Sequence, residues 1–218
     1  MNTQPSPYKE KMSISATRMK RVVSEIRATD PKFAPIIDAH PLCTIGRNDS
    51  KESHFESLVS AIISQQLAMK AADTIHGRLI ALSGGKITPA RIVKLRQEDL
   101  RGVGVSGAKA KTIQGLGRAA LNGEVAVNEL HLVDDETIAK QLTSLWGIGP
   151  WTVDMFLMFQ LGRLDIWPIG DLGVRRGWEK IHRLKEEIEP RKLQLRGEKF
   201  RPHRSIVAWY CWRAIENK

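Results

Sequence analysis

Leu145-Trp-Gly-Ile-Gly-Pro-Trp-Thr152 is the stretch that decides the fold of this 218-residue chain. Its Gly-x-Gly sequence separates the end of one predicted helix from Pro150, where the next helix is predicted to begin. Glycine permits positive φ, and proline suits the first helical turn because its missing N–H has no partner there. Exposed amide N–H groups at such a turn, together with the positive end of the following helix, can bind phosphate.

A second Gly-x-Gly turn occurs in Leu100-Arg-Gly-Val-Gly-Val-Ser-Gly-Ala-Lys109. Taken alone, either turn is also typical of an ordinary helix end in the left-handed conformation. Two such turns in one basic chain favour a shared role in holding a phosphate backbone, which positions a nucleic-acid strand without reading its sequence. The predicted backbone contacts are Gly147, Gly149 and Thr152 at one turn and Gly104, Ser106 and Lys109 at the other.

Helical periodicity dominates the rest of the chain, whereas alternating runs of β-branched residues are nearly absent. One run with spacings of three and four comprises Phe55, Leu58, Val59, Ile62 and Ile63. Ser53 followed by Glu56 predicts a capping box, and Thr88 before Pro89 predicts another helix start. The sequence therefore predicts an all-α fold, with helices over residues 16–28, 53–67, 69–82, 89–95, 107–122, 135–145, 150–161 and 172–183.

The composition favours an anionic partner. Thirty-four Lys and Arg against 24 Asp and Glu give a net charge of +10, which is typical of nucleic-acid binding, although surplus lysines also serve solubility. The two cysteines, Cys43 and Cys211, lie far apart without Cys or His at ligand spacing, which excludes a zinc site or an iron–sulfur cluster built from them.

The ends and the hydropathy of the chain indicate where it works. Residues 1–17 are polar and lack the apolar centre of a signal peptide, and no stretch is long and apolar enough to span a bilayer. We expect an intracellular monomer, located with the DNA, that has no membrane partner. A loose N-terminal tail over residues 1–17 should precede one domain over residues 18–218.

A family resemblance connects these features. The stretch 145–152 and the downstream Pro168-Ile-Gly-Asp171 resemble the helix-hairpin-helix, Gly/Pro-rich loop and aspartate of the DNA glycosylase superfamily, in particular its 3-methyladenine DNA glycosylase II branch. The resemblance extends to Ile62-Ile-Ser-Gln-Gln-Leu67, to residues 104–109 and to residues 201–212, and covers about residues 30–215. It implies two helical lobes, about 55–160 and about 18–54 plus 161–218, with a cleft between them for DNA and a base.

The activity implied by this resemblance is monofunctional base excision repair. Such an enzyme flips alkylated purines, 3-methyladenine or 7-methylguanine, out of double-stranded DNA and hydrolyses the N-glycosidic bond to leave an abasic site. Asp171 is the predicted catalytic carboxylate, because the reaction develops oxocarbenium character at C1′ and a helix N-terminus stabilises a negative charge. An ordinary N-cap is the alternative role for Asp171. Bifunctional members close the hairpin with a lysine, and Trp151 at this position predicts no lyase activity.

Aromatic residues are expected to line the base pocket. By resemblance these are Trp151, Trp212 and Trp209, whereas Met155 stands where better-studied members of the branch carry a tyrosine. Aromatic faces attract a cationic base by about 0.5 to 2 kcal/mol. Most buried aromatic rings simply fill a core, and we expect this of Trp146, Trp178 and one of Trp209 and Tyr210.

Two further sites are implied by the resemblance. Gln65 and Gln66 end an apolar helix and are predicted to fill the gap that a flipped base leaves, with Gln66 as the main wedge. The alternative is a solvated surface pair. No cofactor is expected, except a structural Na+ or K+ ion held by hairpin backbone carbonyls of Thr143, Leu145 and Ile148.

Two other functions remain open from the sequence. A non-catalytic helix-hairpin-helix module would grip the DNA backbone but would have no use for Asp171 or an aromatic pocket. A glycosylase for oxidised or mismatched bases is the other alternative, although the absent hairpin lysine and absent cluster cysteines disfavour it.

Overall fold

The computed structural model describes residues 14–47 and 52–216, which divide into two compact units. Unit 1 contains described residues 52–156, and unit 2 contains residues 14–47 and 157–216. Across these described ranges the chain forms helices and no strand, which confirms the predicted all-α fold. A π-helix, η3 (Phe156–Gln160), starts at the last residue of unit 1 and continues into unit 2.

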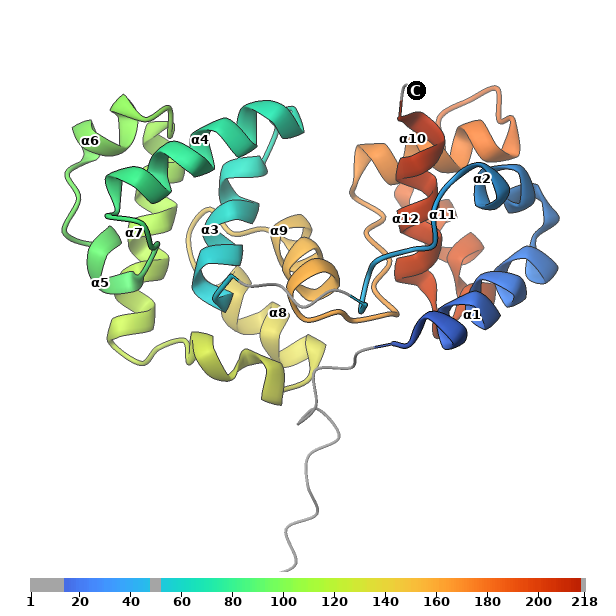
Figure 1. Ribbon diagram of the computed structural model, residues 1–218, viewed down its shortest axis with the longest axis horizontal. Helices are drawn as coiled ribbons and strands as arrows, with labels where there is room; N and C mark the ends of the chain where they lie inside the picture. The colour runs from blue at the N-terminus through green and yellow to red at the C-terminus, as the bar shows by residue number, and fades with distance from the viewer. Residues whose placement is uncertain (1–13, 48–51, 217–218) are drawn as a thin grey trace, which may run out of the picture. The chain divides into compact units, whose positions relative to one another are not determined.

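Unit 1 is built around α3 (His54–Ser64), which contacts α4 (Met69–Leu82), α7 (Gly107–Leu121), α9 (Pro150–Met155) and the 3₁₀-helix η2 (Val127–Leu132) (Figure 1). The remaining helices of the unit are α5 (Pro89–Ile92), α6 (Gln97–Gly102) and α8 (Asp135–Thr143). The predicted apolar run of α3 is fully buried, because every member of it is at most 2% exposed. Burial of this face stabilises the unit by about 1.5 to 3 kcal/mol per large side chain.

Unit 2 contains α1 (Ala16–Thr29), the 3₁₀-helix η1 (Pro31–Phe33), α2 (Ala34–Ala39), α10 (Leu172–His182), α11 (Pro190–Gly197), the 3₁₀-helix η4 (Glu198–Phe200) and α12 (Arg204–Ile215). Helices α10 and α12 pack side by side along much of their length (Figure 1). This packing depends on Gly177, because a Cβ there would overlap the backbone of Cys211. Asp171 is the N-cap residue of α10, and Trp212 lies on α12.

Helix starts follow the sequence closely. Ser53 caps α3 by accepting a hydrogen bond from the Glu56 N–H at 3.1 Å, and Thr88 caps α5 by accepting one from the Arg91 N–H at 3.3 Å. Helix α3 ends at Ser64 rather than near residue 67, because Gln65 leaves the helical conformation with ψ 124° and Gln66 is left-handed with φ 54°. Helix α12 was not predicted, since it is buried on nearly all sides and has no polar face to give a helical period.

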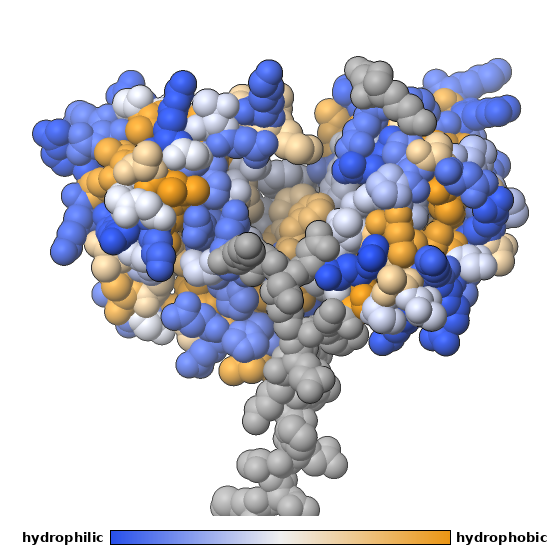
Figure 2. Space-filling view, in the orientation of Figure 1, coloured by the Kyte–Doolittle hydropathy of each residue, from blue (hydrophilic) through white to orange (hydrophobic). Residues whose placement is uncertain are grey.

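The expected tail over residues 1–17 lies mostly outside the described residues. Its last four residues do not form a tail, which corrects that expectation. Ile14 is 4% exposed and donates its N–H to the Gly46 carbonyl at 2.7 Å, and Ser15 caps α1. Hydrophilic side chains cover most of the visible outer edge of each unit, with smaller apolar areas between them (Figure 2).

Candidate functional site

The carboxylate of Asp171 is held by two donors. Asp171 is the N-cap residue of α10, is 9% exposed, and its Oδ1 accepts the Val174 N–H at 2.7 Å. The same oxygen accepts the indole Nε1–H of Trp212 at 2.8 Å, from a residue 41 positions later on α12. The N-cap role is therefore real, but capping needs only the first bond. The second bond fixes the orientation of the carboxylate.

An aromatic pair lies beside this carboxylate. The Trp212 and Phe159 ring centroids are 5.6 Å apart at an interplanar angle of 31°. Phe159 is 50% exposed. An exposed aromatic face beside an oriented carboxylate is suited to a cationic planar ligand.

The loop that leads to Asp171 is anchored by the start of α12. Arg204 is 7% exposed and donates through Nε to Asp165 Oδ1 at 2.8 Å and through its Nη2 to the Asp165 carbonyl at 2.9 Å. Ser205 Oγ donates to the Arg163 carbonyl at 2.8 Å and accepts the Ile166 N–H at 2.9 Å. This anchor could not be predicted from spacing in the sequence, because its partners are about 40 residues apart and Arg204 is a residue type that is usually exposed.

The side chains of Gln65 and Thr152 are hydrogen-bonded to each other rather than directed toward solvent. The Gln65 side-chain amide donates to the Gly147 carbonyl at 3.1 Å and to Thr152 Oγ1 at 2.8 Å. Thr152 is 1% exposed, so its hydroxyl is not placed to contact phosphate, which corrects that prediction. Gln65 is likewise not placed as a wedge. Gln66, the next residue, is exposed.

Lys109 departs from its predicted role as a phosphate contact. Its Nζ donates to the carbonyls of Ile63 and Gln65, each at 2.7 Å. Partial burial lowers the pKa of the Lys109 amine below its ordinary value of 10.5. The ammonium therefore binds the backbone carbonyls at the end of α3. Ser106 caps α7 by accepting the Lys109 N–H at 3.3 Å through its hydroxyl. Gly104, in the turn before this helix, has φ +100°.

The hairpin between α8 and α9 has a glycine in the left-handed region. Gly147 is exposed with φ +82°, and a Cβ at this position would overlap Thr112 Oγ1 on α7. Gly149 has φ −101° and no atom close to an added Cβ. Only Gly147 therefore requires glycine for its geometry.

The predicted cation ligands lie in the same hairpin. The Ile148 N–H donates to the Leu145 carbonyl at 3.2 Å, and the Thr143 hydroxyl donates to the Ala139 carbonyl at 2.6 Å. The Leu145 carbonyl thus accepts a hydrogen bond within the hairpin, and a monovalent cation at these carbonyls stays a prediction. Among the residues that the structure describes, no group of three or more His, Cys, Asp or Glu side chains is placed to hold a metal ion.

The tryptophans differ from the predicted division between pocket and core. Trp151 and Met155 are partly exposed on α9, one turn apart, and so share a face. Trp209 is 5% exposed, with the Arg213 guanidinium 4.8 Å above its ring and Tyr210 packed edge-on, so it belongs to the core and not to a pocket wall. Trp146 was expected in the core but is 56% exposed, with Lys111 Nζ 4.4 Å above its ring.

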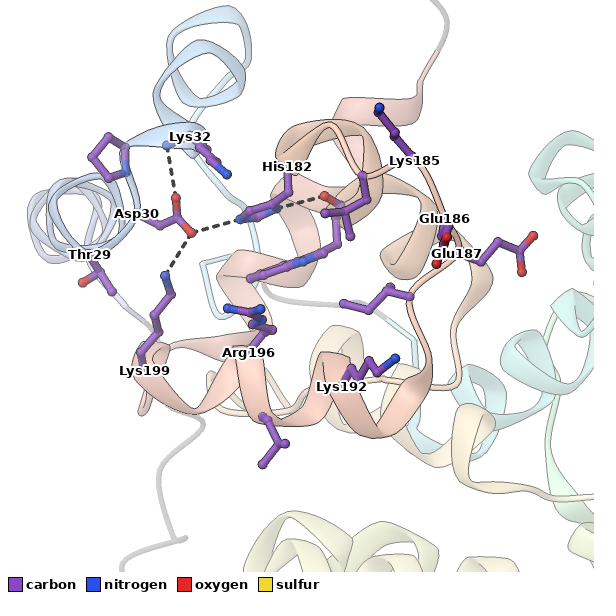
Figure 3. A pocket seen from close by; sticks show the side chains of 15 residues that line it. Thr29, Asp30, Lys32, His182, Lys185, Glu186, Glu187, Lys192, Arg196 and Lys199 are labelled. Carbon is purple, nitrogen blue, oxygen red and sulfur yellow. Dashed lines mark hydrogen bonds and ion pairs between the residues drawn. The ribbon is translucent and has the colours of Figure 1, made fainter.

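Unit 2 also contains a large pocket of about 1140 Å³ that includes none of the predicted site residues (Figure 3). At one side of it the carboxylate of Asp30 accepts hydrogen bonds from Lys199 Nζ and lies 3.0 Å from His182 Nε2. His182 stacks on Trp178 with ring centroids 3.9 Å apart. The cluster joins α1, α10 and η4 and has a structural role in the unit.

Both cysteines lie buried in unit 2 as free thiols. Burial raises the pKa of the Cys43 thiol to about 12, and burial also raises the pKa of Cys211. Neither thiol has the character of a nucleophile or a metal ligand. In the described part of the chain, no helix combines the length and apolar character that a membrane crossing requires.

Known proteins resemble this chain in sequence and structure. Residues 59–202 match the family described as HhH-GPD superfamily base excision DNA repair protein. DNA-3-methyladenine glycosylase 1 of Schizosaccharomyces pombe is 34% identical over 170 residues, which cover 77% of this chain and 75% of the relative. The solved structure of S. pombe 3-methyladenine DNA glycosylase Mag1 with abasic DNA has a TM-score of 0.77 at 29% identity and covers 89% of this chain and 95% of that one. A DNA-3-methyladenine glycosidase from Bacillus halodurans has a TM-score of 0.73 at 34% identity, with 88% of each chain covered.

Proposed function

Because the chain belongs to the HhH-GPD superfamily of base excision DNA repair proteins, we propose that it is a monofunctional DNA glycosylase that excises alkylated purines from duplex DNA. Its substrates are 3-methyladenine and 7-methylguanine, and its product is an abasic site. The names of the relatives and the abasic DNA bound to a structural neighbour support this assignment. The observation that carries it in this chain is the doubly held carboxylate of Asp171.

Asp171 is the catalytic residue in this proposal. As the C1′–N bond breaks, the deoxyribose gains oxocarbenium character, and a carboxylate beside it stabilises that charge or orients the attacking water. Water supplies the hydroxyl group at C1′ and releases its other proton to solvent, and the bonding electrons leave with the base. The Val174 N–H and the Trp212 indole keep the carboxylate oriented before the reaction, so no reorganisation is needed at that moment.

The leaving group explains why a single carboxylate suffices. A purine methylated at N3 or N7 is already cationic and departs as a neutral base, so no general acid has to supply a proton. The chain has Trp151 where a Schiff-base lysine would stand, so hydrolysis ends at the abasic site without strand cleavage. Trp212, which contacts Asp171 within unit 2, is the base-stacking residue of this proposal, and the partly exposed Trp151 and Met155 of unit 1 stay predictions from the sequence.

The hairpins supply sequence-independent affinity for DNA. Main-chain N–H groups at Gly147 and Gly149 are the proposed phosphate contacts, whereas the Gly104 N–H in the other turn donates to the Arg101 carbonyl at 3.0 Å. A bound Na+ or K+ ion would be held by the carbonyls of the hairpin and would add positive charge toward a phosphate. Since phosphate contacts dominate such binding, affinity for undamaged duplex should fall steeply as salt rises.

Single-turnover release of methylated purines from alkylated duplex DNA tests the proposal. The wild type should release 3-methyladenine or 7-methylguanine, and Asp171→Asn should lower the rate at least about a hundredfold while DNA affinity is retained. Asp38→Asn is the matched control, because it changes an exposed carboxylate in the same unit and should leave the rate unchanged.

The other outcomes separate the alternatives. If the wild type binds DNA but releases neither base, a panel of duplexes with oxidised or mismatched bases distinguishes a glycosylase for another lesion from a non-catalytic DNA-binding module. Equal release by the wild type and Asp171→Asn would remove Asp171 from the mechanism. A flat salt response of binding would contradict the DNA assignment itself.

A further inference from the structure

We propose that Lys109 and the Gln65 side chain form a positioning relay that fixes the exposed loop over residues 66–69 to both glycine turns of unit 1. In this relay Lys109 acts through the loop and does not contact phosphate. The proposal rests on the proposed function, because this loop carries the predicted wedge that replaces the flipped base.

The first half of the relay is the ammonium of Lys109. The last carbonyls of an α-helix have no partner within the helix, and a cation near that end is favourable. Lys109, in the first turn of α7, donates to two such groups, the carbonyls of Ile63 and Gln65. The turn over residues 102–107 is thereby tied to the point where α3 ends.

The second half is the amide of Gln65. Its two N–H groups donate to two acceptors, the Gly147 carbonyl in the hairpin and the buried hydroxyl of Thr152 on α9. A methyl or carboxylate group at this position would leave the Gly147 carbonyl without this donor. The Gln65 side chain therefore connects the loop to the hairpin at Gly147. Its backbone carbonyl accepts a hydrogen bond from Lys109, which follows the other glycine turn.

The relay defines the backbone conformation of Gln66. It has φ 54°, which is uncommon for a residue with a side chain and persists where the surroundings define it strongly. Lys109 holds the peptide unit just before Gln66 through the Gln65 carbonyl, and the Gln65 side chain is held by Gly147 and Thr152. Beyond it, Leu67 and Met69 are 40% and 72% exposed, so the loop presents Gln66 and apolar side chains on the surface. Such a mixture fits insertion into a base stack.

The decisive variant is Lys109→Met, which keeps the apolar stem and removes the ammonium. Three results are expected. Single-turnover excision at saturating enzyme falls at least about tenfold, the affinity for undamaged duplex changes less than about twofold, and the slope of log affinity against log salt stays at the wild-type value. A phosphate contact would instead lower that slope by about 0.9 and weaken binding.

Lys111→Met is the matched control. It removes the same charge from the same helix two residues later, on roughly the opposite face, where Lys111 lies over Trp146. Its excision rate at saturating enzyme should stay within about twofold of the wild type. If both lysine variants lose excision equally, the effect is one of net charge and the relay is wrong.

Amide hydrogen exchange tests the relay without using activity. In Lys109→Met, peptides that cover residues 62–69 should exchange faster, whereas peptides from α10 should exchange as in the wild type. Gln65→Met should accelerate exchange in the same segment and at the hairpin. Unchanged exchange in both variants overturns the relay. A wild type that excises no base but shows these exchange changes would reject the proposed function and leave the relay standing.

Discussion

The indole Nε1 of Trp212 and Oδ1 of Asp171 are joined by a hydrogen bond of 2.8 Å inside unit 2. A predicted pocket residue thus contacts the predicted catalytic carboxylate directly, and one side chain can both face a base and orient an anion. Hydrogen bonds to a charged group contribute about 1.5 to 3 kcal/mol, which is enough to matter for a catalytic geometry.

Trp212→Phe separates the two roles, since phenylalanine keeps an aromatic face but has no N–H donor. We expect the single-turnover rate of base release to fall about tenfold or more, because about 1.4 kcal/mol of lost transition-state stabilisation corresponds to a factor of ten. Binding of undamaged duplex should be unaffected. Trp146→Phe, at an exposed position, is the control. A rate equal to that of the wild type would mean that the indole N–H does not support the carboxylate.

Gly147→Ala tests the geometry of the hairpin. Alanine must adopt φ +82° and place its Cβ against Thr112, so the free energy of unfolding should fall by about 2 kcal/mol or more. Gly149→Ala is the control, because it has an ordinary φ and open space. Denaturant unfolding measures both variants. Equal stability of the two would show that the hairpin relaxes around the added methyl group.

Acid sensitivity should depend on Asp30. Burial alone would raise the pKa of Asp30, but hydrogen bonds from His182, Lys199 and the Lys32 N–H outweigh it and lower the pKa below its ordinary value of 3.8. A lowered folded-state pKa stabilises the fold above the unfolded value, and this contribution is lost as the pH falls through the folded-state pKa.

The measurement for Asp30 is the difference in unfolding free energy between the wild type and Asp30→Asn at several pH values. The difference should be largest at neutral pH and should shrink as the pH falls below 3.8. Glu187→Gln, an exposed carboxylate that lines the same pocket, should show a much smaller difference. A difference that is constant with pH would show that the Asp30 carboxylate does not contribute through its charge.

Local signals in the sequence predicted much of the fold. Caps such as Ser53 and Thr88, and the apolar run of α3, involve residues within one or two turns, so their spacing is visible in the sequence. Helix α12 escaped prediction because a helix buried on nearly all sides has no polar period. Ends of helices were less accurate where a single residue such as Gln66 changes conformation.

The residues of the candidate site were predicted by residue type and by resemblance, whereas the hydrogen bonds that join them were not. Asp171 stands at the start of a helix as expected, but its bond to Trp212 joins residues far apart in sequence. Lys109 and Thr152 were expected to touch phosphate because of their place in the turns. Their polar groups instead bond within the protein, and nothing in a single sequence distinguishes a buried hydroxyl or ammonium from an exposed one.

The contacts that anchor the Asp171 turn also bear on the order in which this part of the chain forms during synthesis. The chain is synthesised from its N-terminus, so the turn leaves the ribosome before the groups that hold it, which follow 39 residues after Asp165 and 41 residues after Asp171. A nascent chain that has not yet exposed α12 carries the carboxylate with the Val174 N–H but without the indole donor of Trp212. Asp171 thus acquires its bond to the Trp212 indole late in translation, when α12 packs against α10.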